Sequence, residues 1–123
     1  MKKLLIILHY FITICFAQII PISNGDWQNP NIWSDGQLPG SSNDVVIPSN
    51  LTIRISGSII VKSITVNGVL TASTASDINL QTEWIMVIGN DALFEVGAPE
   101  NPFNSSCTIT LTGIDDGDDI MGM

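Results

Sequence analysis

Basic residues are scarce in this sequence, which has four Lys and Arg and one His among 123 residues, against twelve Asp and Glu. The histidine, His9, lies near the N-terminus, as do Lys2 and Lys3. The chain beyond them therefore lacks the most common general base and metal ligand. It also shows no phosphate-cradling glycine loop, no Ser–His pair and no paired-cysteine metal motif.

The first 17 residues are typical of a secretory signal peptide. Lys2 and Lys3 precede an apolar run, Leu4 to Phe16, that is too short to span a bilayer. The small residue Ala17 then precedes Gln18, which predicts cleavage between the two. We expect an exported protein, secreted or at the cell surface, with no membrane association after removal of the signal.

Removal of the signal leaves a strongly acidic chain. Arg54 and Lys62 are the only cations beyond residue 17 and all twelve acidic residues remain, so the net charge becomes −10. Such a chain repels nucleic acid and anionic membranes. Divalent-cation binding is compatible with this charge.

Cysteine is equally scarce, since Cys107 is the only one left beyond the signal. No internal disulfide can form, so stability depends on burial of apolar side chains. We expect Cys107 itself to be a small buried hydrophobic residue at the start of a strand.

Apolar residues recur with a period of two, which predicts an all-β chain. Leu51, Ile53 and Ile55, for example, alternate with polar neighbours. The segments with this pattern are 45–47, 51–56, 64–66, 69–72, 78–81, 84–88, 93–96 and 108–112. Gly, Asn and Asp at the intervening turns are typical of short strands.

The pattern is compatible with more than one arrangement of these strands. Asn67-Gly68 predicts a hairpin, whereas residues 78–97 favour stacked coils. No repeat of fixed length is present. We favour a β-helix or solenoid-like module, with a β-sandwich as the alternative.

Residues 25–48, GDWQNPNIWSDGQLPGSSNDVVIP, contain too much Pro and Gly for a helix and predict a shaped loop leading into a strand. Trp27 and Trp33 are large enough to hold this loop on the domain. We expect both rings to close the end of a β core, with a sugar-stacking platform as the alternative.

The order of short motifs resembles the eight-glycine, or G8, domain. The motifs are NPNIW, LPG, NDVVIP, LTI, ITVNGVL, WIMV, LFEVG, ENPF and TITLTG, between about Gly25 and Gly113. The resemblance implies landmark glycines at Gly36, Gly40, Gly68, Gly89 and Gly97, accompanied by Trp33, Pro39, Asp44 and Pro102. From their own chemistry, we expect a positive φ at Gly68 and Gly97, and we expect Asp44 to accept backbone N–H groups.

The resemblance also implies a role in binding or processing extracellular polysaccharide and, in larger members, a β-helix downstream. We therefore expect a signal peptide at 1–17, a linker at 18–24, a β domain at 25–114 and, at 115–123, an acidic tail or the start of a missing continuation. On this interpretation the chain is truncated or is a fragment.

Other candidate sites are weaker. Asp115, Asp116, Asp118 and Asp119 surround a glycine and supply oxygen ligands for calcium, although a solvated acidic tail is the stronger interpretation. Trp84 follows Glu83 and is expected to be buried. In the alternative interpretation, Glu83 is an acid with a raised pKa and the Trp84 ring stacks on a sugar. Asn50 and Asn104 match the N-glycosylation acceptor, which applies only in a eukaryotic secretory pathway.

These observations predict a non-catalytic extracellular β module that binds or presents to polysaccharide, with Trp27, Trp33 and Trp84 as the candidate ligand-binding residues. One alternative is the leading domain of a hyaluronidase-like enzyme, although the sequence does not indicate which of its carboxylates would act together in catalysis. Another is a structural or adhesive spacer. No cofactor is expected apart from the possible calcium.

Overall fold

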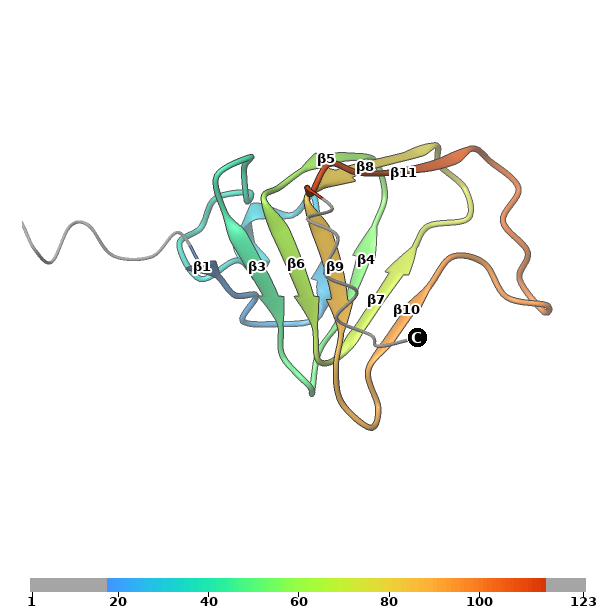
Figure 1. The fold of residues 1–123 in the computed structure, drawn as a ribbon. Coiled ribbons are helices and arrows are strands. Elements are labelled where there is room, and N and C mark those ends of the chain that lie inside the picture. The colour runs from blue at the N-terminus through green and yellow to red at the C-terminus, as the bar shows by residue number, and fades with distance from the viewer. Residues whose placement is uncertain (1–17, 115–123) are drawn as a thin grey trace, which may run out of the picture.

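The computed structural model describes residues 18–114, which form a parallel β-helix (Figure 1). The first coil contains β1 (Gln18–Ile19) and β2 (Gly25–Asp26), and a short 3₁₀ helix, η1 (Pro30–Ile32), follows them. The second contains β3 (Asp44–Ile47), β4 (Thr52–Ile55) and β5 (Ser58–Ile60). The third contains β6 (Ser63–Val66), β7 (Val69–Ala72) and β8 (Ile78–Thr82), and the fourth β9 (Trp84–Val87), β10 (Leu93–Glu95) and β11 (Cys107–Leu111).

Each coil adds one strand to each of several sheets. The three sheets have the orders β1-β3-β6-β9, β10-β7-β4-β2 and β11-β8-β5, and every pair within them is parallel. Strands next to each other in the sequence therefore lie in different sheets. This arrangement confirms the predicted solenoid.

The predicted hairpin at Asn67-Gly68 is wrong. β6 pairs with β3 and β9, whereas β7 pairs with β4 and β10. Gly68 instead forms a corner between two sheets, where its N–H donates to the carbonyl of Ile47 and its carbonyl accepts from Leu93 in the next coil. A tight-turn sequence fits a solenoid corner as well as a hairpin, because both reverse or redirect the chain within two residues.

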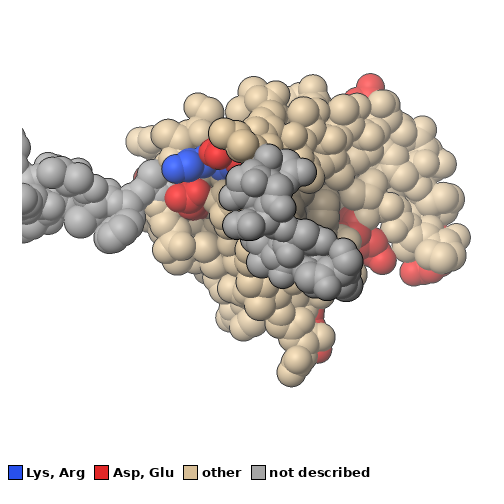
Figure 2. Space-filling view, in the orientation of Figure 1, with Lys and Arg blue, Asp and Glu red and all other residues tan. Residues whose placement is uncertain are grey.

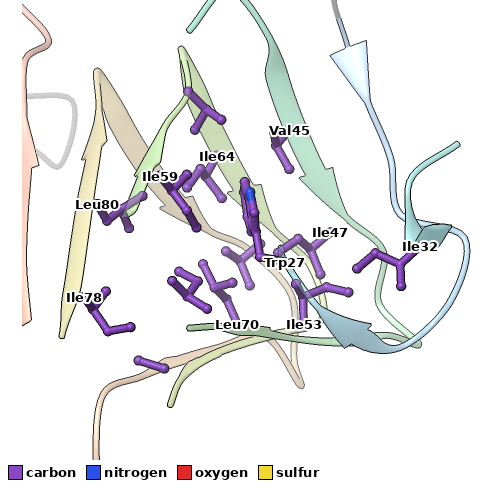
Figure 3. Packing of buried hydrophobic residues seen from close by; sticks show 14 of the residues in the cluster. Trp27, Ile32, Val45, Ile47, Ile53, Ile59, Ile64, Leu70, Ile78 and Leu80 are labelled. Carbon is purple, nitrogen blue, oxygen red and sulfur yellow. The ribbon is translucent and has the colours of Figure 1, made fainter. Parts of the chain in front are cut away.

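The core consists of columns of aliphatic side chains that run from coil to coil. Val45 and Ile64 are aligned in one sheet and fully buried, as are Ile53 and Leu70 in the next. Alternation along β4 places Ile53 and Ile55 inside and Arg54 outside, as predicted. Figure 3 shows these buried side chains converging from several strands.

The two tryptophans of the first loop belong to this core. Trp27 and Trp33 are each 1% exposed, and their rings meet edge to face with centroids 4.9 Å apart. The Trp33 indole N–H donates to the Trp27 carbonyl at 2.9 Å, and the Trp27 N–H donates to the carbonyl of Arg54. The expected closure of the core is confirmed. The sugar-stacking alternative is wrong for these two rings, because neither has a face open to a ligand.

Residues 18–24, expected to be a linker, contribute to the first coil. β1 pairs with β3, and Pro21 forms a bridge with Trp33. The Ile22 N–H also donates to the carbonyl of Ile32 at 2.6 Å. Only two residues of β1 are paired, too short a segment for an alternating pattern to be detected in the sequence.

The backbone conformation of Gly68 and the hydrogen-bond partner of Asp44 both differ from the prediction. Gly97 has the expected positive φ of 75°, but Gly68 does not have a positive φ. A Cβ at Gly68 would overlap the carbonyl oxygens of Pro48 and Leu51, so the corner lacks space rather than needing an unusual backbone. Asp44 accepts a hydrogen bond from the Ser63 hydroxyl at 2.5 Å, and within residues 18–114 its carboxylate accepts none from a backbone N–H.

Gly36 and Gly89 also have positive φ values, of 72° and 129°. Gly40 has neither a positive φ nor a crowded Cβ position, and its N–H donates to the side-chain oxygen of Asn43 at 2.7 Å. Gly36, Gly89 and Gly97 thus adopt a positive φ, Gly68 leaves room for backbone carbonyls, and Gly40 donates a hydrogen bond without either requirement.

Candidate functional site

Trp84 lies at the start of β9 and is 42% exposed, which corrects the expectation that it is buried. It is aligned with Ser63 of β6, and Met86 is aligned with Thr65. The alternate residues of β9, Ile85 and Val87, are aligned with the fully buried Ile64 and Val66. The pleat therefore directs Trp84 and Met86 to the outer face of the sheet.

A surface hollow of about 620 Å³ lies beside Trp84. It is lined by Glu83, Trp84, Ile85, Met86, Leu111, Gly113 and Ile114. The lining combines an indole and aliphatic side chains with one carboxylate, and ligand sites commonly have such an apolar surface with few polar groups.

The corner between β8 and β9 positions Glu83. β8 ends at Thr82, so Glu83 lies between two strands and escapes the alternation that would direct it away from Trp84. The Gly113 N–H donates to the Glu83 carbonyl at 2.9 Å, and a Cβ at Gly113 would come within 2.5 Å of that oxygen. A glycine at position 113 thus allows the chain after β11 to form one wall of the hollow.

The sequence indicated only part of this site. Glu83 and Trp84 were identified from their types, and Met86 shares the face of Trp84 through period-two alternation. Leu111 and Ile114 are more than 25 residues away in the sequence and reach the hollow only because one full coil separates β9 from the end of β11. No local pattern could have placed them there.

A second hollow, of about 710 Å³, crosses the corners of several coils. It is lined by Ile20, Val46, Pro48, Ser49, Asn67, Ile88, Gly89, Asn90 and Asp91. Its lining has no aromatic ring on which a sugar could stack. The hollow at Trp84 is therefore the better candidate for a ligand site that uses an aromatic ring.

Charge is unevenly distributed over the surface. On the face shown in Figure 2, basic atoms occur in one place, with acidic atoms beside them. Arg54 lies 3.8 Å from the Asp26 carboxylate, which also accepts hydrogen bonds from Gln28 and Ser56. Within residues 18–114, Arg54 and Lys62 are the only cations, so a polyanion would find no basic surface there.

No cluster of metal-binding side chains occurs between residues 18 and 114. The four aspartates proposed for calcium, Asp115, Asp116, Asp118 and Asp119, lie outside the described residues. Asn50 and Asn104 are both exposed, so the two glycosylation acceptors are sterically accessible.

Cys107, at the start of β11, is half-buried and packs against the core. Desolvation by its neighbours raises the pKa of the thiol. We expect its reaction with an aromatic disulfide reagent at pH 8 to be slower in the native protein than in denaturant, because less thiolate is present. Stopped-flow absorbance measures both rates, and equal rates would contradict the shift.

The raised pKa of Cys107 also makes the stability of the fold depend on pH. The folded chain holds the thiol proton more tightly than the unfolded chain does. The resulting stabilisation of the folded state is fully present below the pKa of the unfolded thiol. It is lost as the pH rises through the pKa of the folded thiol.

Among the described residues, no helix is both long and apolar enough to cross a membrane. No curated protein and no solved structure matches the chain at a significant level. The family model of the G8 domain matches residues 32–122, which is most of the chain and includes the second, third and fourth coils completely. The chain belongs to the G8 domain family.

Proposed function

We propose that this chain is an extracellular β-helical module that binds uncharged polysaccharide through the hollow at Trp84. G8 domains occur in extracellular and cell-surface proteins, and the N-terminal segment has the features of a secretory signal. The observation that carries the proposal is the exposed indole of Trp84, held on the outer face of a rigid sheet beside Glu83.

The geometry favours stacking of a sugar ring. The apolar C–H face of a pyranose packs on an indole, while its hydroxyl groups need hydrogen-bond partners at the edge. Glu83 supplies an acceptor at the edge of the ring, and Met86 and Leu111 extend the apolar surface. Because β9 is held to β6 along its whole length, the ring needs little ordering when a ligand binds.

The negative charge of the chain favours uncharged over anionic polysaccharides. A net charge of −10 after signal removal, with Glu83 in the hollow itself, disfavours a polyanionic chain such as a uronic-acid polymer. An uncharged polysaccharide meets no such repulsion. The proposed ligand class is therefore a neutral glycan.

Trp84→Ala is expected to weaken binding of a neutral polysaccharide by about 10- to 30-fold, because the stacking surface is removed. Its free energy of unfolding should change by less than about 0.5 kcal/mol, since the side chain is on the surface. Trp84→Phe should retain part of the affinity. Isothermal titration calorimetry against neutral and polyanionic polysaccharides measures the affinity, and urea unfolding measures the stability.

Acrylamide quenching gives an independent test. The sequence has three tryptophans, and only Trp84 is exposed, so one component of the fluorescence should be quenched and should become protected by the ligand. If Trp84→Ala binds polysaccharide as well as the native chain does, the assignment of the site is wrong. If the native chain binds no glycan, the module is a spacer.

A further inference from the structure

The two ends of the β-helix differ in how they are covered. Trp27 and Trp33 close the core on the side of the first coil. In the fourth coil, β9, β10 and β11 each lie at the edge of their sheet, with one side unpaired among the described residues. Nine of the thirteen exposed large hydrophobic residues lie between residues 84 and 114.

The strand β11 continues a buried column without being covered. Its central residue, Ile109, is aligned with Leu80 of β8, which in turn is aligned with Ile59 of β5. Leu80 is 0% and Ile59 4% exposed, whereas Ile109 is 40% exposed. Ile109 thus has the direction of a core residue and the exposure of a surface residue.

The sequence around Ile109 is symmetric in its pattern. Residues 106–112 are SCTITLT, in which apolar and hydroxyl side chains alternate identically when the segment is read in either direction. If two copies paired antiparallel around Ile109, each threonine at 108 would face a threonine at 110, and Cys107 would face Leu111. Such Thr–Thr and aliphatic cross-strand pairs stabilise antiparallel sheets.

The charge of this region also suits contact between identical chains. Residues 101–114 contain no charged side chain, although the chain carries twelve acidic residues. Identical acidic chains repel each other unless they meet at an uncharged surface. β11 is an edge strand in the middle of such a surface, whereas β10 contains Glu95 and β9 directly follows Glu83.

We propose that β11 is a self-association surface, at which a second copy of this chain pairs its own β11 antiparallel around Ile109. The two-fold axis would pass between the two Ile109 residues and point toward the core, so inward-facing residues remain inward in both copies. The assembly stops at two copies, because the same β11 surface of each copy is used and the opposite end of each β-helix is covered by the tryptophan loop. The proposal does not rest on polysaccharide binding, although Leu111 belongs both to β11 and to the lining of the hollow at Trp84.

The test measures the mass of the chain expressed from Met1 and purified after export, by sedimentation equilibrium over a range of concentrations. We expect a monomer–dimer equilibrium. Ile109→Lys should raise the dissociation constant on the order of 100-fold, because two like charges meet at the axis. Ile60→Lys is the matched control, since Ile60 is exposed on β5 at the opposite edge of the same sheet, and it should leave the equilibrium unchanged.

A disulfide tests the register. Ile109→Cys in a Cys107→Ser background places two thiols opposite each other, within the Cα separation that a disulfide requires. The native Cys107 residues would be about 14 Å apart along the paired strands, so they should not cross-link. Mild oxidation followed by non-reducing electrophoresis should therefore give a dimer only from the Ile109→Cys protein.

Several results would overturn the proposal. These are a monomer at all concentrations, an equilibrium unaffected by Ile109→Lys, or equal cross-linking through Cys107. If removal of residues 115–123 were needed for dimer formation, the tail and not a second copy would cover β11 in the full chain. Circular dichroism of Ile109→Lys confirms that the variant is folded, and the cross-linking result stands apart from that variant.

Discussion

Replacing Trp27 by alanine is expected to lower the free energy of unfolding by about 3 to 5 kcal/mol, the range for removing a large buried aromatic side chain. Trp27 is 1% exposed and lies in the core with strands of two coils around it (Figure 3). Its loss leaves a cavity at the closed end of the β-helix. It also removes the edge-to-face contact with Trp33.

Urea unfolding followed by circular dichroism measures this effect. Trp84→Ala is the matched control, because it removes the same side chain from the surface of the same fold. Trp33→Phe should cost less, about 1 to 3 kcal/mol, since it leaves the Trp27 carbonyl without its hydrogen bond but keeps most of the buried ring. A Trp27→Ala protein as stable as Trp84→Ala would show that the loop does not close the core.

Gly68→Ala is expected to destabilise the fold by about 3 kcal/mol, at the upper end of the cost of overpacking. The added methyl group would overlap two backbone carbonyl oxygens, those of Pro48 and Leu51 in the preceding coil. Backbone atoms cannot rotate away as a flexible side chain can. The corner must therefore move, and with it the hydrogen bonds from Gly68 to Ile47 and from Leu93 to Gly68.

Gly40→Ala is the control for this substitution. Gly40 has no positive φ, and the nearest atom to an added Cβ is 3.8 Å away, which is ordinary van der Waals contact. Its stability should stay within about 0.5 kcal/mol of the native value. Thermal unfolding of the two variants side by side separates crowding at the corner from a general effect of replacing glycine. Equal melting temperatures would show that the corner relaxes without cost.

The open end of the β-helix links stability to association. In a solenoid each coil contacts only its neighbours, so the terminal coils lose the packing of one side. Here the tryptophan loop compensates at one end, and the fourth coil leaves Ile109 and Leu111 exposed at the other. Dimer formation through β11 would stabilise the fourth coil, and the melting temperature should rise with protein concentration.

The sequence by itself determined which segments are strands and which of their residues face the core. Alternation of apolar and polar residues predicted β3, β4, β6, β7, β8, β9, β10 and β11 near their observed bounds, because a strand with one buried face must alternate. The burial of Trp27 and Trp33 followed from their size and from the loop around them. The order of the motifs was enough to identify the family.

Only the tertiary structure decided which strands pair and which side chains meet. Asn67-Gly68 has the same local chemistry in a hairpin and in a solenoid corner, and the choice depends on where β3 and β9 lie. The segments β1, β2 and β5 were not predicted. Trp84, Leu111 and Ile114 share one hollow because a coil of β-helix brings together residues far apart in the sequence, and no local pattern records that distance.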